Sequence, residues 1–243
     1  GMMRETVKSV EAVQEDLERS GFVFVSAGDV RPLLAPAALE AWGEFAASWD
    51  DLALDAYLLE RGLRRRRRHA VFSISRGGAI AREPHQPHWQ SREYNALQGG
   101  IERWFSPIVP AVADGVVLRG VLELAARIFG PPPADAWRVE AHQFRIEPRA
   151  NEPGQPTPEG IHRDGVDWVL VLLVARRNVA SGTTTVHAED GSLLGSFTLT
   201  EPLEAALVDD ARVAHGVKPV HAIDPAQPAH RDVLEVTFAR ASS

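Results

Sequence analysis

The spacing of hydrophobic residues divides the chain into a helical first part and a strand-rich second part. In the first part, apolar residues recur every three or four positions, as they do on one face of an amphipathic helix. Gly21 follows the first such stretch, where a left-handed helix cap is common, and prolines 131–133 follow the last. The predicted helices cover residues 6–20, one or two segments within 36–62, then 101–109 and 116–129.

Apolar and polar residues alternate mainly after the three prolines, and this alternation predicts short strands. The predicted strands cover residues 21–25, 69–75, 137–146, 168–174, 183–187, 193–200, 206–208, 213–220 and 232–239. Short strands at this density, with few helices among them, are typical of an antiparallel sandwich or jelly roll. We therefore predict an α+β fold in one domain, residues 1–243. A mainly helical part, 1–66, would pack on a core, 67–243, with inserted helices at about 101–130.

The composition of the chain excludes several kinds of site and partner. A formal net charge of -7 argues against a nucleic-acid-binding surface. The chain has no cysteine, so any metal must be bound by His, Asp or Glu rather than by thiolates. No apolar run approaches the roughly 18–20 residues that span a bilayer, which argues against a membrane partner. No apolar signal-peptide core is seen near the N-terminus, so we expect a cytoplasmic protein.

Five consecutive arginines, Arg64 to Arg68, lead into the predicted strand at 69–75. A run of like charge is most often a solvated face. Because this run enters a strand, alternate arginines could instead point inward and meet a carboxylate. Both interpretations stay open, and Arg67 and Arg68 are candidates for binding a substrate carboxylate.

The stretch 160–168, GIHRDGVDW, carries a histidine and a carboxylate two residues apart. Side chains alternate along extended chain, so His162 and Asp164 would face the same spot. They would form two-thirds of a 2-His-1-carboxylate iron site. The pair alone is weak support, because chance gives about 0.5 such pairs in a chain of this composition, and a second one occurs at His230-x-Asp232.

The third ligand has to be a histidine on a distant strand. Only the first pair has a suitable downstream partner, since no histidine follows His230. His215 lies within a predicted strand, beside Gly216, which leaves room for a close ligand. Its nearest rival, His221, follows Pro219 in a segment that drifts into a turn. We therefore predict that His162, Asp164 and His215 bind the metal and serve catalysis.

Arg231 opens the last predicted strand, beyond His215. A dicarboxylate that binds a metal through one end needs a cation at the other end. The planar guanidinium of arginine suits this role because it can bind a carboxylate through two parallel hydrogen bonds. Arg231 is therefore our candidate for that cation.

With these four residues, the second half of the chain resembles the iron(II)/2-oxoglutarate-dependent dioxygenases. Their signature is His-x-Asp, a distal His and then an Arg. The sequence is most similar to the bacterial 2OG-Fe dioxygenase family, which includes free L-isoleucine hydroxylases and a biofilm, stress and motility protein. The similarity runs from about Arg67 to Phe238, with softer matches at Gly99-Gly100, at 142–146 and at 208–210.

The resemblance implies a fold, a reaction and a set of cofactors. The fold would be a double-stranded β-helix, a jelly-roll or cupin-like core with N-terminal and flanking helices. Fe(II) would be bound by His162, Asp164 and His215, and the co-substrate 2-oxoglutarate by Arg231, with O2 as oxidant. The reaction would hydroxylate a small polar molecule, most consistently a free amino acid, and release succinate and CO2.

One position departs from the pattern of the wider superfamily. Many relatives have Ser or Thr two residues after the arginine, where the hydroxyl helps to bind the distal carboxylate of 2-oxoglutarate. This chain has Val233 there, so the hydroxyl has to come from elsewhere.

Several residues are candidates for binding the substrate. Gln143 and Arg145 share one face of the predicted strand 137–146, while His142 and Phe144 share the other. We favour Arg145 as partner of a substrate carboxylate, with Gln143 beside it. Tyr94 and Asn95 lie in a loop, 77–100, that could cover the site. His85 and His88 could bind a metal if their segment were helical, but Pro84 and Pro87 argue against a regular helix. His69 and His187 have no partner that the sequence reveals.

Two other functions compete with the oxygenase. The first is a cupin-like metal protein, an isomerase or a 2-oxoglutarate-independent oxygenase; Arg231 argues against it, because it needs no dicarboxylate clamp. The second is a non-catalytic barrel with a regulatory or binding role in stress or biofilm physiology, and the intact triad argues against that. A homo-oligomer is compatible with the sequence.

Overall fold

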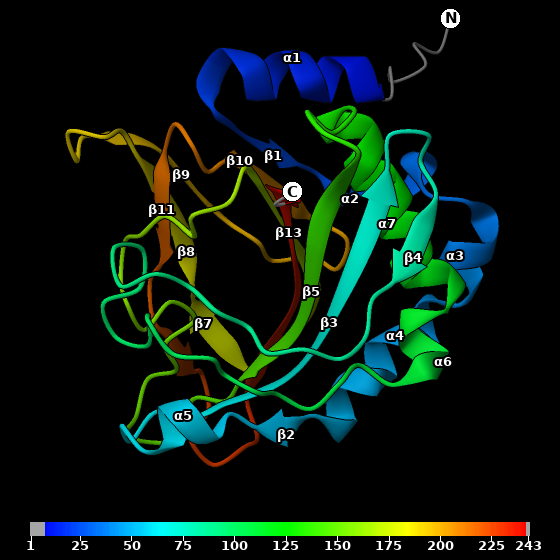
Figure 1. Ribbon diagram of the computed structural model, residues 1–243. Coiled ribbons are helices and arrows are strands. Elements are labelled where there is room, and N and C mark those ends of the chain that lie inside the picture. The colour runs from blue at the N-terminus through cyan, green and yellow to red at the C-terminus, as the bar shows by residue number, and fades with distance from the viewer. Residues whose placement is uncertain (1–7, 242–243) are drawn as a thin grey trace, which may run out of the picture.

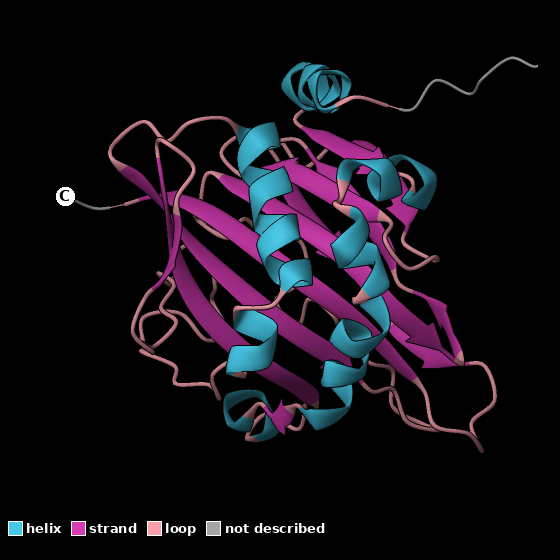
Figure 2. Ribbon diagram, turned by 90° about the vertical axis from the view of Figure 1, so that its right-hand side faces the viewer, coloured by secondary structure: helices cyan, strands magenta, loops and turns pink. Residues whose placement is uncertain are grey.

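A large antiparallel sheet and a smaller one face each other, and most of the helices cover the outer face of the large sheet. The computed structural model describes residues 8–241. The helices are α1 Val10–Ser20, α2 Ala27–Val30, η1 Arg31–Leu33, α3 Pro36–Glu40, α4 Trp42–Ala47, η2 Ser48–Asp51, α5 Ala56–Leu59, α6 Pro110–Ala113 and α7 Val116–Phe129. Figure 2 shows helices lying across one face of the large sheet.

The strands form three sheets. They are β1 Phe22–Val25, β2 Ala53–Leu54, β3 Arg65–Ser75, β4 Ile80–Arg82, β5 Ala136–Ile146, β6 Trp168–Arg177, β7 Val179–Ser181, β8 Thr183–His187, β9 Leu193–Thr198, β10 Ala205–Asp209, β11 Ala214–Val217, β12 Val220–Ala222 and β13 His230–Arg240. The large sheet runs β1-β10-β6-β13-β5-β3-β2, with β4 on β3; the others are β11-β8-β9 and β12-β7. Figure 1 shows β8 and β11 across from β3 and β5. This is the predicted α+β jelly roll.

Each long strand of the large sheet has two faces with different tasks. On β5, Trp137, Val139 and Ala141 pack into the main hydrophobic core beneath the helices. Residues that alternate with these along the strand, such as Glu140 and His142, line a cavity on the opposite face. β13 and β3 divide in the same way, because side chains alternate along a strand. The helices thus stabilise one face of the sheet and leave the other free for chemistry.

The arginine run extends β3 at its N-terminal end, so alternate arginines do point inward. Arg65 and Arg67 are buried, and both contact the buried carboxylate of Asp55 at 3.3 Å. Arg66 and Arg68 lie on the other face, where Arg68 donates to the backbone oxygens of Asp51 and Pro107. Of the two interpretations left open by the sequence, the inward one holds for two of the five arginines.

The helical prediction for residues 101–109 is wrong. This segment is extended and pairs with neighbouring chain: Arg103 exchanges backbone hydrogen bonds with His88, and Ile108 donates to the oxygen of His69. The apolar spacing arose because the segment packs on β3. The helices expected within 36–62 form, but as short pieces separated by η2 and β2. The helix expected at 116–129 is confirmed as α7. Of the helix expected at 6–20, residues 6 and 7 lie outside the described part.

The longest helix, α7, has 14 residues. Across residues 8–241, every helix is too short or too polar to cross a bilayer.

Candidate metal centre and substrate cavity

The loop before β6 carries His162 and Asp164, and one buried carboxylate fixes its shape. Asp210 accepts the backbone N–H groups of Asp164, Gly165 and Val166 at 2.9, 2.8 and 3.0 Å. Gly165 has a φ of 81°, and a Cβ there would lie 2.5 Å from the ring of Tyr94. Asp210 and Gly165 therefore hold the backbone on which Asp164 stands.

His162 and His215 are brought together by backbone pairing. The N–H of His162 donates to the oxygen of His215 at 2.8 Å, and the reverse bond measures 2.9 Å. Gly216 allows this approach, since a Cβ there would lie 3.1 Å from the Cα of Ile161. The space beside Gly216, which we expected to admit a close ligand, is taken up by the neighbouring backbone of Gly160 and Ile161.

The three side chains converge on one point. A donor atom from each of His162, Asp164 and His215 lies within 4.8 Å of the others. The Nε2 atom of His162 lies 3.1 Å from Asp164 Oδ1, and Nε2 of His215 lies 3.8 Å from Asp164 Oδ2. His162 Nδ1 donates to the oxygen of Gly160 at 2.9 Å, which orients its Nε2 toward the shared point.

The protonation of this group follows from burial and charge. Burial lowers the pKa of His162, but the Asp164 and Glu159 carboxylates outweigh it and raise that pKa to about 10. Burial raises the pKa of Asp164, yet His162 and His215 lower it to about 2. Burial lowers the pKa of His215 to about 4. Asp164 is therefore an anion at neutral pH.

The residues fit the metal that the sequence predicts. Two imidazoles and one carboxylate are the donor set of non-haem Fe(II) oxygenases. Within the described part of the chain, Asp164 Oδ2 and His215 Nδ1 are buried without a hydrogen-bond partner. Buried polar atoms in that condition are costly unless a ligand satisfies them.

Arg231 lies on the other side of His215, in a smaller cavity. Both residues line this cavity, together with Thr157, Thr184 and Val233. The side chain of Arg231 is 2% exposed, and its Nε and Nη2 atoms have no hydrogen-bond partner among residues 8–241. Burial lowers its pKa to about 10, so the guanidinium stays charged at neutral pH. A buried, charged and unsatisfied guanidinium needs an anion.

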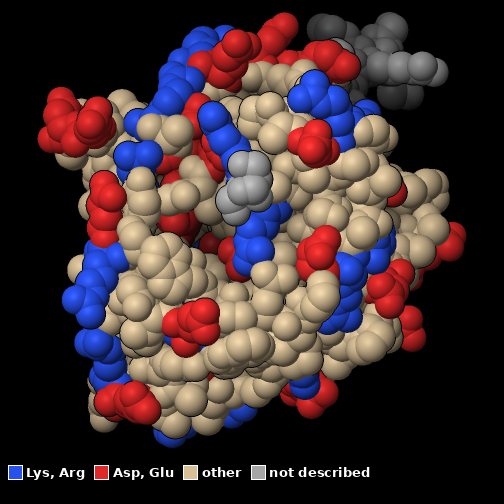
Figure 3. All heavy atoms as spheres, in the orientation of Figure 1, with Lys and Arg blue, Asp and Glu red and all other residues tan. Residues whose placement is uncertain are grey.

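A larger cavity of about 260 Å³ opens beside His162 and Asp164. Its wall carries charges of both signs, among them Arg65, Arg67, Arg103, Arg138, Glu140 and Glu159. Of the residues proposed from the sequence for substrate binding, Arg67, Tyr94 and Asn95 line it. On the face shown in Figure 3 the surface is hollowed, with acidic and basic side chains around the hollow.

The other three candidates for substrate binding lie outside this cavity, which corrects their assignment. Arg145 donates to both oxygens of Asp232, at 2.8 and 2.9 Å, and to Asp50. Gln143 donates to the hydroxyl of Ser48, and Arg68 bonds backbone oxygens as described above. All three side chains stand on the outer face of the sheet and bond neighbouring groups there, although Gln143 Oε1 is buried without a hydrogen-bond partner among residues 8–241.

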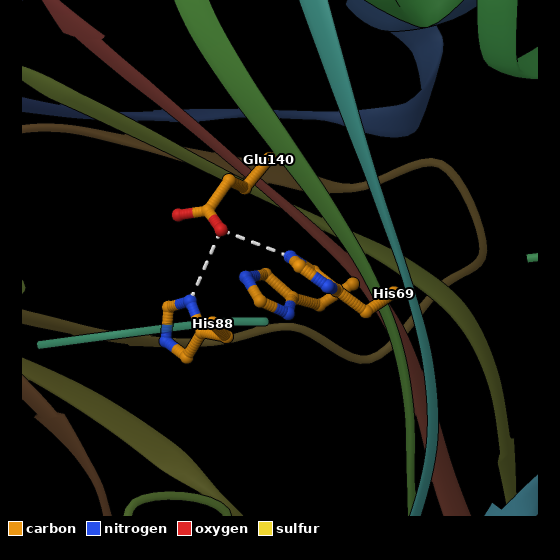
Figure 4. A group of neighbouring side chains, drawn as sticks. His69, His88 and Glu140 are labelled. Carbon is orange, nitrogen blue, oxygen red and sulfur yellow. Dashed lines mark hydrogen bonds and ion pairs between the residues drawn. The ribbon is translucent and has the colours of Figure 1, made fainter. Parts of the chain in front are cut away.

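A second group of polar side chains in the cavity wall was not recognised in the sequence. It consists of His69, His88, Glu140 and His142, whose donor atoms also lie within 4.8 Å of one another. Figure 4 shows His69 and His88 directed at one oxygen of Glu140. The pairs are 71 and 52 residues apart along the chain. Strand parity could have placed Glu140 and His142 on one face, but not against His69 and His88.

Comparison with known proteins gives matches over most of the chain. The profile of the family described as 2OG-Fe dioxygenase matches residues 46–237. The 3(1)-hydroxy-L-isoleucine 4-dioxygenase of Pantoea ananatis (strain AJ13355) is 25% identical over 207 residues, which cover 83% of this chain and 82% of that protein.

Solved structures show the same architecture. A bsmA homolog from Methylobium petroleophilum PM1 superposes with a TM-score of 0.83 at 35% identity, covering 98% of this chain and 95% of that one. The structure of IDO from Bacillus thuringiensis gives a TM-score of 0.78 at 19% identity over the whole of both chains.

Proposed function

The chain belongs to the 2OG-Fe dioxygenase family, and from this membership we propose that it hydroxylates a free amino acid. It is a non-haem iron enzyme that depends on 2-oxoglutarate. When bound, Fe(II), 2-oxoglutarate and O2 supply the oxidation that converts a C–H bond into an alcohol, with release of succinate and CO2.

In this proposal the chain itself supplies the geometry. His162, Asp164 and His215 hold the metal on the cavity floor, and Asp210 keeps Asp164 in place through the backbone. Arg231 binds the distal carboxylate of 2-oxoglutarate. The hydroxyl missing at Val233 comes from Thr184, which lines the same small cavity from β8 and is 5% exposed.

The charges in the wall of the larger cavity support an amino acid as the substrate. Arg65, Arg67 and Arg103 lie together, and burial and mutual repulsion lower the pKa of Arg103 to about 10. Asp55 is the carboxylate that Arg65 and Arg67 contact, so it offsets one of these three positive charges. The excess positive charge suits a substrate carboxylate. The Pantoea relative is named for an amino-acid substrate, which agrees with this proposal.

The size of the cavity supports a small molecule as substrate. Pockets that hold drug-sized ligands are typically about 300–1,000 Å³, and this one measures about 260 Å³. The paired charges in its wall also argue against an apolar substrate, because burying charged groups against apolar surface is unfavourable.

Succinate release tests the proposal. The protein would be purified without oxygen, supplied with Fe(II) and 2-oxoglutarate, and exposed to O2 with each free L-amino acid in turn. We expect at least one amino acid to raise succinate release above the uncoupled background and to gain one oxygen atom by mass spectrometry. If no amino acid raises succinate release, the proposed substrate class is wrong, while the dioxygenase assignment is unaffected.

A further inference from the structure

His88, Glu140 and His142 line the larger cavity, and the buried His69 contacts Glu140, but this group lies apart from the proposed iron ligands. Glu140 is 8% exposed. Its Oε1 atom accepts from His69 Nε2 at 2.9 Å and from His88 Nδ1 at 3.2 Å, and Arg138 Nη2 lies 3.6 Å away. Figure 4 shows its other oxygen, Oε2, pointing away from both imidazoles.

The second carboxylate oxygen of Glu140, Oε2, is the atom on which this inference is based. Within residues 8–241, Oε2 has no hydrogen-bond partner, yet it is not closed off in the protein interior. Burial would raise the pKa of Glu140, but hydrogen bonds from His69 and His88 hold it well below its usual value. The protein therefore presents a negatively charged acceptor, fixed from behind, to the cavity.

Groups next to Glu140 extend this acceptor site. Thr237 on β13 is the direct cross-strand partner of Glu140 and lines the same cavity. Side chains directly opposite each other on neighbouring strands have Cβ atoms about 4.5–5.5 Å apart. The hydroxyl oxygen of Thr237 can therefore accept a second hydrogen bond from a group that is bound to Glu140.

A second metal ion is the main competing occupant of this group. Arg67 Nη2 lies 2.9 Å from His142 Nδ1, so Nδ1 must accept and the proton of this imidazole is on Nε2. A protonated Nε2 cannot bind a metal. His69 and His88 both donate to Glu140 Oε1, so this oxygen has its partners without an ion. This group also has fewer buried atoms without a hydrogen-bond partner than the group of His162, Asp164 and His215, because His69 Nδ1 is the one such atom in it.

We propose that Glu140, held by His69 and His88 and assisted by Thr237, binds the ammonium group of the substrate. The inference rests on the proposed amino-acid function. The substrate would lie between Glu140 and the arginine group of Arg65, Arg67 and Arg103, with its carboxylate on the arginines. The wall thus selects a zwitterion by placing opposite charges at separate positions of one cavity.

Binding measurements on the Glu140→Gln variant test this inference. The protein would be loaded without oxygen with Mn(II) and 2-oxoglutarate, then titrated calorimetrically with the amino acid that best raises succinate release and with its des-amino carboxylic acid. We expect Glu140→Gln to bind the amino acid at least about 30-fold more weakly, because one partner of a buried charge pair is lost. The des-amino acid should bind both proteins with similar, weak affinity.

Two further variants keep the test decisive. Glu147→Gln, on the same chain beyond the end of β5, removes a carboxylate that pairs with Arg66 outside the cavity and should bind the amino acid like the wild type. Glu140→Asp retains the charge but withdraws it by one methylene group, so we expect an intermediate loss. If Glu140→Gln does not fold, as judged by lost 2-oxoglutarate binding, the amino-acid affinity of Glu140→Asp tests the inference in its place.

Three results would overturn the inference, and they are distinguishable. Unchanged amino-acid affinity in a folded Glu140→Gln protein would remove Glu140 from substrate binding while the amino-acid function stands. Failure of the wild type to bind any amino acid would remove both. A second equivalent of metal in the wild type, measured by elemental analysis and lost in Glu140→Gln, would make the group a metal site.

Discussion

Two groups of histidines and carboxylates contribute side chains to the wall of the same cavity, and they differ in what lies behind each donor. In the group of His162, Asp164 and His215, a backbone oxygen orients His162 from behind, and Asp164 Oδ2 is left without a partner. In the group of His69, His88, Glu140 and His142, an arginine donates to His142 from behind, and Glu140 Oε1 accepts two imidazole N–H groups.

Proximity of ligand-type atoms therefore does not by itself define a metal site. Both groups meet the same distance criterion of 4.8 Å. A histidine can bind a metal only through a nitrogen that carries no proton, and the hydrogen bond to its other nitrogen decides which one that is. An acceptor behind the ring favours metal binding, whereas a donor behind the ring opposes it.

Removal of Asp164 should separate the two groups most strongly. We expect Asp164→Ala to bind Fe(II) more than about 100-fold more weakly, because loss of a direct ligand should exceed the 10–100-fold cost of losing a supporting residue. Turnover should vanish. Glu140→Gln should keep one iron per chain by elemental analysis. Equal iron loss in the two variants would erase the distinction between the groups.

Arg231 extends the comparison to cations. Nε and Nη2 of its guanidinium have no hydrogen-bond partner among residues 8–241, while the guanidinium of Arg145 pairs with Asp232 and Asp50. We expect Arg231→Gln to weaken 2-oxoglutarate binding by about 30-fold or more, as for a lost buried charge pair. Calorimetry on the Mn(II) protein measures this. Arg145→Gln should leave the 2-oxoglutarate affinity unchanged and instead lower the midpoint of urea unfolding, since it strands the buried carboxylate of Asp232. If Arg145→Gln weakened 2-oxoglutarate binding and Arg231→Gln did not, the assignment of Arg231 to 2-oxoglutarate would be wrong.

Asp210 should affect the metal group without touching the metal. Its replacement by Ala leaves three backbone N–H groups near Asp164 without an acceptor. We expect Fe(II) affinity to fall by about 10–100-fold, the usual effect of a supporting residue. Asp209→Ala is the matched control, because Asp209 accepts one N–H, from Ala211. Identical Fe(II) affinities for the two variants would show that Asp210 does not position Asp164.

The smallest expected effect concerns the pH dependence of stability in the second group. Burial lowers the pKa of His69 to about 4. Between about pH 6.5 and that value the unfolded chain binds a proton that the folded chain does not, so the free energy of unfolding falls as the pH falls. From pH 7 to 5 this contributes a loss of about 1–2 kcal/mol.

Urea unfolding at the two pH values measures this loss. His69→Gln removes the titrating group, so we expect its stability to fall less over the same interval than that of the wild type. The same fall in both proteins would mean that His69 is not the neutral donor that holds Glu140.

The proposed metal ligands could be selected from the sequence because they form a motif with an order. His162 and Asp164 are two residues apart, and His215 and Arg231 follow on later strands, so spacing and sequence order selected them from nine histidines. Their convergence is visible in the structure, although their roles stay a proposal. The alternation that marks β5 was also readable along the chain.

The inward face of β5 could not be predicted, because both faces carry polar and aromatic residues. From the sequence alone, Gln143 and Arg145 are as suitable for a cavity wall as His142 and Phe144. The helices decided the matter, since Ser48 and Asp50 of η2 meet Gln143 and Arg145 from outside. Contacts between segments 95 residues apart leave no local signal. The same holds for His88, whose loop position reveals nothing of Glu140.

The division of β5 between two faces has a consequence for evolution and for engineering. Residues that face the helices build the hydrophobic core, while Glu140 and its cavity neighbours are, in our proposal, the ones that select the substrate. Because consecutive residues belong to different sets, selection can act on one set with little cost to the other. A library confined to cavity-facing positions such as 140, 142 and 237 would therefore explore new substrates on an intact scaffold.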